Sequence, residues 1–303
     1  MIATSLRQLE YFVSAVDTGT VTGAAQRCSA SQAAVSAGLN DLEAALGTQL
    51  LVRRPAKGVT LTSGGERMLP IARRMLADAE DLASLAEAEQ GQISGRLRIA
   101  CTVALSPRVL PAIAEEFALR HPEVRLEFAD GLASEVQDLV LSGAADVCLL
   151  YRRQLLPGLN TRSVREVHPY AVLPADHPWA DEPDVPLAAL ADEQLIIVRA
   201  AASSRVMEAM IEEAGVSPHA GWAFSNPETV RSMVARGLGY SLFSGRPIGV
   251  ETFDGRRVAY VRVRDEVHPN EIVLAVQHGQ RPNARLDALI ALLEEPAVQA
   301  TFG

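Results

Sequence analysis

The stretch that decides the fold is GTVTGAAQRCSASQAAVSAGLNDLE, residues 19–43. It predicts two short helices, one over 21–27 and one that begins after Ser31, with a polar break at 28–30 between them. Ser31 is a good N-cap because its hydroxyl can accept a hydrogen bond from an amide of the first helical turn. The second helix carries apolar residues at spacings of three and four and a polar stripe opposite them. This is the layout of a helix-turn-helix, in which the outer face of the second helix enters the DNA major groove.

Small side chains in both helices are expected to let them cross closely: Ala24, Ala25, Ala33 and Ala34. The inward-facing residues are predicted to be Val35, Leu39 and Leu42. The residues predicted to contact DNA from the second helix are Ser31, Gln32, Ala34, Ser36 and Asn40. A plain helical hairpin remains the alternative for this stretch alone.

A small basic hairpin is predicted directly after this unit. Two short β-rich runs within 49–62 flank a Pro-Ala-Lys-Gly turn. A basic hairpin beside a helix-turn-helix is a wing, and Arg53, Arg54 and Lys57 are placed to contact phosphates or the minor groove. A solvated surface hairpin is the alternative.

A long helix is predicted from Thr62 or Ser63 to about Gln90, with Glu66 placed for a capping box. Residues at spacings of three and four form a seam suited to a coiled coil: Leu69, Ala72, Leu76, Ala79, Ala83 and Ala86, widened by Met68, Ile71, Met75, Leu82 and Leu85. A second copy of the chain is the expected partner of this seam. Packing onto the chain's own C-terminal domain is the alternative.

From Arg96 onward, short apolar runs alternate with amphipathic helices. The βαβαβ order over 97–150 predicts a parallel sheet with helical crossovers, and a second such set follows over 171–276. The expected fold class is therefore α/β: an all-α winged helix-turn-helix, a linker helix, and two α/β lobes with a ligand cleft between them.

Composition sets further bounds. The chain has 303 residues, 48% apolar and 21% charged, which is typical of soluble globular proteins. No apolar run is long enough to span a membrane, and no signal peptide is evident, so a cytoplasmic location is expected. The net charge of −9 is unusual for a DNA-binding protein, but residues 1–62 carry five basic and four acidic side chains. Local rather than global positive charge serves phosphate contacts.

Three cysteines, at 28, 101 and 148, form no disulfide framework and no CxxC pair. Cys101 and Cys148 are expected near the ends of two neighbouring strands, either as inert core or as a thiol redox switch. No Gly-rich nucleotide loop, nucleophile elbow or metal-ligand spacing is present, so neither a cofactor, a metal nor a catalytic site is expected.

With these motifs in place, the whole chain resembles the LysR-type transcriptional regulators. The resemblance rests on residues 9–12, 24–25, 31–36, 42–43, 46–47, 50–54, 61–62 and 65, and further on 97–99, 110–111, 121–122, 143, 146 and 237–240. It implies a winged helix-turn-helix over 1–62, a linker dimerisation helix over 63–92 and a periplasmic-binding-protein-like effector domain over 93–303. The first lobe would comprise about 93–164 and 265–303, and the second about 165–264. Such proteins are usually homotetramers built from linker-helix dimers, and they bind double-stranded promoter DNA.

The recognition helix departs from the family's pattern. Larger polar residues are frequent there, whereas this chain has Ala37, Gly38 and Asn40. Glycine removes a side chain that could touch DNA, so we expect base readout to rest chiefly on Gln32 and Ser36, with DNA shape supplying the rest.

The effector is expected at two helix starts that face the cleft, after residues 101–106 and 200–205. Free amides at helix starts favour anions, and Arg205 could hold a carboxylate, so an aromatic or small carboxylate is the hypothesis. In similar proteins these segments line the effector site, which points to Thr102, Ser106, Ser203 and Ser204. Tyr151, Ser225, Asn226 and Phe243 are further candidates at strand ends. Ordinary helix caps are the alternative.

Two other classes of protein fit only part of this sequence. A solute-binding protein would suit the bilobed half alone, but the winged N-terminal unit and the missing signal peptide speak against it. An enzyme is not supported by any nucleophile, metal or cofactor motif.

Overall fold

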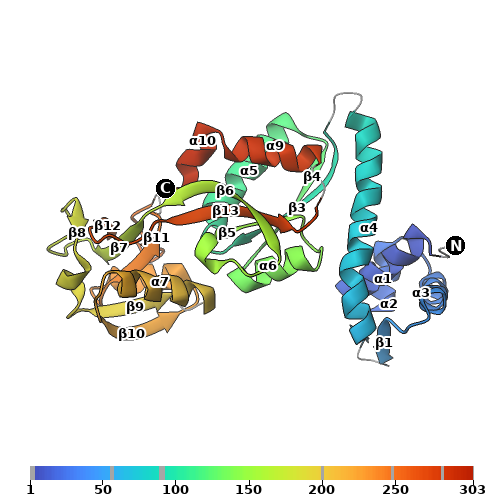
Figure 1. Cartoon of the computed structure of the whole chain (residues 1–303), viewed down its shortest axis with the longest axis horizontal. Helices are drawn as coiled ribbons and strands as arrows, with labels where there is room; N and C mark the ends of the chain where they lie inside the picture. The colour runs from blue at the N-terminus through green and yellow to red at the C-terminus, as the bar shows by residue number, and fades with distance from the viewer. Residues whose placement is uncertain are drawn as a thin grey trace. The chain divides into compact units, whose positions relative to one another are not determined.

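The computed structural model describes the chain over residues 4–54, 58–88, 93–198, 201–246, 249–280 and 283–302, with side chains throughout except at 83–88 and 201–206. The chain divides into two compact units, residues 1–96 with 141–144 and residues 97–140 with 145–303. Figure 1 traces the elements of each unit.

Three helices build the N-terminal unit: α1 (Leu6–Thr18), α2 (Val21–Arg27) and α3 (Gln32–Leu46). Each begins at a hydroxyl cap, since the side chains of Ser5, Thr20 and Ser31 accept hydrogen bonds from first-turn amides. Val35, Leu39 and Leu42 are fully buried and pack with apolar residues of α1 and α2. The predicted helix-turn-helix is therefore confirmed, with both helices at their expected positions.

The hairpin that follows has the form of a wing. Strand β1 (Leu51–Arg54) pairs antiparallel with β2 (Gly58–Leu61), and Arg54 faces Gly58 across the turn. Gly58 has a φ of +78°, and a Cβ there would lie 2.3 Å from the carbonyl oxygen of Gly19, so only glycine fits. The neighbouring amide of Val59 donates to that same oxygen, which ties the wing to the α1–α2 turn. Lys57 lies outside the described residues.

Helix α4 (Ser63–Ala88) begins at Thr62, whose hydroxyl accepts a hydrogen bond from the Gly65 amide at 3.0 Å. With Thr62 as the cap, Glu66 stands one position beyond the one a capping box requires, so that part of the prediction is wrong. The helix reaches close to its expected end, and residues 89–92 lie outside the described residues.

The predicted coiled-coil seam on α4 needs correction. Leu69 and Ala72 are buried in the core of the same N-terminal unit, and Met68 and Leu76 pack against that core. The exposed apolar residues are instead Ile71, Met75 and Leu82, with 49%, 41% and 72% of their surface accessible. The residues closest to the helix-turn-helix thus pack within the chain, because α1 covers them. The side chains of Ala83, Leu85 and Ala86 are outside the described part.

The C-terminal unit contains a five-stranded sheet in the order β4-β3-β5-β13-β6. Its strands are β3 (Gly95–Thr102), β4 (Val124–Gly131), β5 (Val147–Tyr151), β6 (Leu159–Val167) and β13 (Asn270–Gln277). Strands β3 and β5 are parallel as predicted, whereas β13 runs antiparallel to both of its neighbours. In Figure 1, α5 (Ser106–Arg120) and α9 (Ala284–Leu293) lie on one side of this sheet and α6 (Ala133–Leu141) on the other.

The remaining strands form two smaller sheets between residues 169 and 263. One has the order β11-β7-β12-β8, with β7 (Pro169–Pro174), β8 (Asp184–Val185), β11 (Ser241–Ser244) and β12 (Val258–Val263). The other pairs β9 (Gln194–Val198) with β10 (His219–Phe224) in parallel. The expectation of a second parallel set is wrong for the larger of the two, because β7 pairs antiparallel with β11 and β12.

Helices α7 (Ala201–Glu213) and α8 (Pro227–Val234) accompany these sheets. Short helical segments complete the chain: η1 (Arg152–Gln154), η2 (Leu187–Leu190), α10 (Pro296–Gln299) and η3 (Ala300–Phe302). Among the helices described, none combines the length and the apolar content that a membrane crossing requires.

Candidate functional site

The outer face of α3 carries the residues that were predicted to contact DNA. Gln32 and Asn40 are exposed and Ser36 is half-buried. Ser31 Oγ accepts a hydrogen bond from the Ala34 amide at 3.1 Å, so this hydroxyl already serves the helix as its cap. Ala33 and Ala34 are both exposed, so the expectation that they lie between the helices is wrong. The close crossing uses Ala24 and Ala25, which are buried.

Gly38 has a packing role that sequence reasoning missed. A Cβ at this position would lie 2.7 Å from Cδ2 of Tyr11, closer than real side chains approach. The Tyr11 ring is only 9% exposed, and its hydroxyl accepts a hydrogen bond from Arg7 Nε at 3.2 Å. Gly38 therefore accommodates the α1 ring, and its missing side chain would have pointed toward Tyr11.

Glu43 joins the end of α3 to the wing. Its Oε1 accepts hydrogen bonds from the amides of Leu50 and Leu51, at 2.7 and 3.0 Å, just where β1 begins. Its Oε2 lies 3.6 Å from Nη2 of Arg53. Arg54 is exposed beside it, in the last position of the strand. Helix α3 and the wing are thus held together by one carboxylate, and both present side chains to solvent.

The C-terminal unit contains a cavity of about 960 Å³, lined by residues of both its larger sheet and its smaller sheets. Of the predicted effector residues, Ser106, Asn226 and Phe243 line it, as do the further candidates Tyr151 and Ser225. Thr102 does not belong to the lining; it is 3% exposed, and its Oγ1 finds no hydrogen-bond partner among the described residues. The side chains of Ser203, Ser204 and Arg205 lie outside the described part, on a helix whose later residues Met207 and Met210 do line the cavity.

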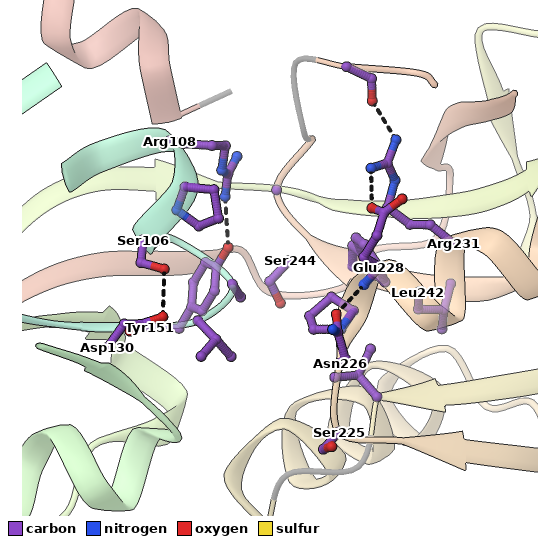
Figure 2. A pocket seen from close by; sticks show the side chains of 18 of the residues that line it. Ser106, Arg108, Asp130, Tyr151, Ser225, Asn226, Glu228, Arg231, Leu242 and Ser244 are labelled. Carbon is purple, nitrogen blue, oxygen red and sulfur yellow. Dashed lines mark hydrogen bonds and ion pairs between the residues drawn. The ribbon is translucent and has the colours of Figure 1, made fainter. Parts of the chain in front are cut away.

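One wall of the cavity centres on the first turn of α5 and the end of β5 (Figure 2). Ser106 Oγ lies 3.4 Å from Oδ2 of Asp130, to which it donates. Arg108 donates through Nη2 to the Tyr151 hydroxyl at 3.3 Å. Burial raises the pKa of Tyr151 above its usual value, although the neighbouring Arg108 opposes this. The phenol therefore stays protonated at neutral pH.

The opposite wall is built by the start of α8 (Figure 2). Asn226 caps this helix, since its Oδ1 accepts a hydrogen bond from the Glu228 amide at 2.8 Å. Glu228 Oε2 pairs with Arg231 Nη1 at 2.5 Å. Arg231 Nη2 then donates to the carbonyls of Gly249 and Glu251, both at 2.8 Å. This carboxylate–guanidinium pair fixes the segment that forms the rim of the cavity.

Sequence reasoning missed the two arginines, Arg108 and Arg231. Each stands within the first two turns of a helix that begins with proline at the cleft, after Ser106 and Asn226 respectively. That position was the available signal, because a basic side chain so close to a cleft-facing helix start can reach the same space as the cap. Within the described residues, no cluster of three metal-ligating side chains occurs.

The two cysteines of the large sheet lie on adjacent parallel strands, with Ala100 opposite Cys148 and Cys101 opposite Leu149. Both are free thiols with no accessible surface. Burial raises the pKa of Cys148 to about 12 and also raises that of Cys101 well above its ordinary value. Since the thiolate is the form that reacts with oxidants, both have the character of inert core residues.

A winged helix-turn-helix unit in the same chain as a unit with a ligand-sized cavity defines the class of ligand-responsive DNA-binding regulators. Comparison with known families specifies the class further. Residues 6–66 match the bacterial regulatory helix-turn-helix protein family of LysR type, and residues 90–297 match the LysR substrate binding domain. The chain belongs to the LysR family of transcriptional regulators.

Individual relatives agree with this assignment. The Hca operon transcriptional activator HcaR of Escherichia coli is 26% identical over 98% of this chain and 99% of its own length. The HTH-type transcriptional regulator YvbU of Bacillus subtilis is 29% identical over 79% of this chain and 81% of its own. The crystal structure of HinK, a LysR family regulator from Pseudomonas aeruginosa, superposes with a TM-score of 0.63 at 27% identity, covering 96% of this chain and 98% of HinK.

Proposed function

We propose that a small-molecule effector, bound between the two lobes of the C-terminal domain, controls promoter binding or activation by this LysR-type regulator. The observation that carries the proposal is the cavity whose lining comes from α5, β5, α8 and β11. Its volume is in the range of natural small-molecule sites. The effector would contact Ser106, Asn226 and Phe243, and Ser203, Ser204 and Arg205 from α7. Contact between Thr102 and the effector stays a prediction, because Thr102 is buried and does not line the cavity.

An anionic effector, a carboxylate, fits the helix starts of α5 and α8 at the cavity. Ser106 begins α5, and Asn226 begins α8. The positive end of each helix favours negative charge at these points.

The DNA-binding face comprises the outer surface of α3 and the wing. We assign base contacts chiefly to Gln32 and Ser36, and phosphate or groove-edge contacts to Ser31, Ala34, Asn40, Arg53, Arg54 and Lys57. The support is the exposure of Gln32, Asn40, Arg53 and Arg54 on two elements that Glu43 connects. A helix that docks in the major groove with a basic hairpin beside it reads bases and backbone together.

The active form is proposed to be a homodimer through α4, and further a homotetramer, acting in the cytoplasm where promoter DNA lies. The exposed residues Ile71, Met75 and Leu82 support a second copy as the partner of this helix. The proposed domains are 1–62 for DNA binding, 63–92 for the linker, and 93–303 for effector binding. We assign the chain no catalytic activity, since the members of its family are transcriptional regulators.

Promoter footprinting with two alanine variants tests the DNA-binding face. Gln32→Ala is expected to weaken specific binding by about 1–3 kcal/mol, because it removes a base contact. Arg53→Ala is expected to weaken binding and to lower the salt dependence by about one phosphate contact. The matched controls are Gln26→Ala and Arg27→Ala, which change exposed residues of α2. If both test variants bind as their controls do, the assignment of this face is wrong.

A further inference from the structure

The two arginines of the cavity differ in their partners. Arg231 is paired with the carboxylate of Glu228. Arg108 donates to neutral acceptors: the Tyr151 hydroxyl at 3.3 Å, the Phe302 carbonyl at 3.0 Å and the Arg246 carbonyl at 3.2 Å. Across the described residues, no carboxylate forms an ion pair with Arg108. A half-buried guanidinium without a counter-charge is unfavourable, so an anion at this point would be stabilised.

Tyr151 provides a second donor at the same place. Its side chain is buried, with 7% of the residue exposed, and its oxygen accepts the hydrogen bond from Arg108. A phenol that accepts one hydrogen bond still has its own O–H to donate. Arg108 and Tyr151 therefore offer a cationic and a neutral donor side by side, as Figure 2 shows. A carboxylate has two oxygens that can accept from two such donors.

Much of the rest of the lining is apolar. The side chains that could contact the body of a ligand are Val198, Met207, Met210, Leu242 and Phe243. The other ionised groups of the lining are acidic apart from Arg231: Asp130, Glu228 and Glu251. Glu228 is engaged by Arg231, and Asp130 and Glu251 are exposed. A second carboxylate on the ligand would face these acids, so the cavity favours a single negative charge.

We infer that Arg108 and Tyr151 bind the carboxylate of a monocarboxylic acid whose aromatic or aliphatic body lies against the methionines of α7 and the apolar residues of β11. This inference rests on the proposed function, which makes the cavity the effector site. It adds the chemical class of the effector and the residue that selects its charge.

The test uses calorimetric titration of the full-length protein with benzoate and hexanoate, each compared with its uncharged amide. At least one acid is expected to bind, and its amide to bind about tenfold more weakly or worse, because the amide lacks the charge that Arg108 recognises. Arg108→Gln is expected to weaken acid binding by about tenfold and to remove the preference for acid over amide, and Arg108→Lys to restore part of it. The matched control is Arg125→Gln, which changes an arginine that is 80% exposed in the same lobe.

Arg108 also holds two backbone carbonyls, so Arg108→Gln could unfold the C-terminal segment. Tyr151→Phe keeps the ring and removes only the hydroxyl, and it should weaken binding of the acid. The inference is wrong if the amides bind as well as the acids, or if neither acid binds. In each of these cases, promoter binding by the same protein sample decides separately whether the regulatory function stands.

Discussion

Gly38 of α3 is constrained by α1, the helix that packs against it. Glycine inside a helix costs about 1 kcal/mol relative to alanine, so its presence needs a reason. The reason is the Tyr11 ring of α1, which occupies the space that a Cβ would take. Interpretation of the sequence assigned the glycine to the DNA side, because periodicity alone does not show which neighbouring helix approaches most closely.

Gly38→Ala is therefore expected to destabilise the protein, by about 1 kcal/mol, although it improves helix propensity. Overpacking against a buried ring costs about 1–3 kcal/mol and outweighs the gain in propensity. Urea unfolding followed by circular dichroism measures the change. Ala37→Gly is the control, because its exposed position should show only the propensity loss of about 1 kcal/mol. A more stable Gly38→Ala protein would contradict the packing explanation.

Cys101 and Cys148 are residues whose role is decided by burial. Both were placed correctly on neighbouring strands, but the choice between a redox pair and core could not be made from spacing. Burial favours the role of inert core, because burial keeps both thiols protonated. A raised pKa in the folded state favours the neutral thiol, so this contribution to stability is complete below the unfolded pKa near 9 and is lost as pH rises toward 12.

Alkylation with iodoacetamide at pH 8.5 should leave both thiols unmodified in the folded protein and modify both in urea. Mass spectrometry of the digested protein measures the extent at each cysteine. Cys28, which is 4% exposed in the other unit, serves as an internal reference for local opening. Rapid labelling of Cys148 in the folded state would show that its strand opens, and would reinstate the redox interpretation.

At the scale of elements, α4 divides its apolar residues between two uses. Leu69 and Ala72 complete the core beneath the helix-turn-helix, and Ile71, Met75 and Leu82 remain exposed. The exposed set has spacings of four and seven, so it follows one stripe of the helix. The first turns pack on α1 within the N-terminal unit, which neither interpretation of the sequence named, and a second copy as the partner of the exposed stripe stays a prediction.

Leu82→Glu should weaken the dimer, because it places a charge where two copies of this stripe would meet. Burial of one leucine contributes about 1.5–3 kcal/mol, and a two-fold interface loses two of them. Light scattering across a dilution series measures the dissociation. Arg67→Ala is the control, since it changes the net charge by the same amount at another exposed position of α4. Equal masses for both variants at every concentration would count against the proposed interface.

At the scale of the whole molecule, most elements could be predicted, and their pairing only in part. Apolar periodicity located α1 to α9 and the buried strands, because each of these has a face that must be covered. Strand β6 was missed: it lies at the edge of its sheet, and most of its residues are polar and accessible. The antiparallel pairing of β7 with β11 and β12 was missed because it joins segments about 70 to 90 residues apart, which element order does not reveal.

The residues that line the cavity could also be predicted only in part. Ser106, Asn226 and Phe243 could be predicted because helix starts and strand ends mark the cleft. The positions of Arg108 and Arg231 near helix starts were a signal, but their acceptors could not be predicted, because the carbonyl oxygens of Phe302 and Gly249 lie 194 and 18 residues away. Whether an arginine is neutralised is a property of the assembled unit, and no local motif records it.

The short side chains on the outer face of α3 affect the conformational entropy that is lost when this face binds a partner. The exposed alanines at 33, 34 and 37 have no rotamers to lose, whereas a lysine or arginine loses about 2 kcal/mol of side-chain conformational entropy when it is immobilised. A surface of such short side chains starts nearly preorganised, so its association with any rigid partner is opposed mainly by the loss of overall motion. The selectivity of this face is then expected to rest on its few longer side chains, such as Gln32, and on the fit of a largely fixed shape.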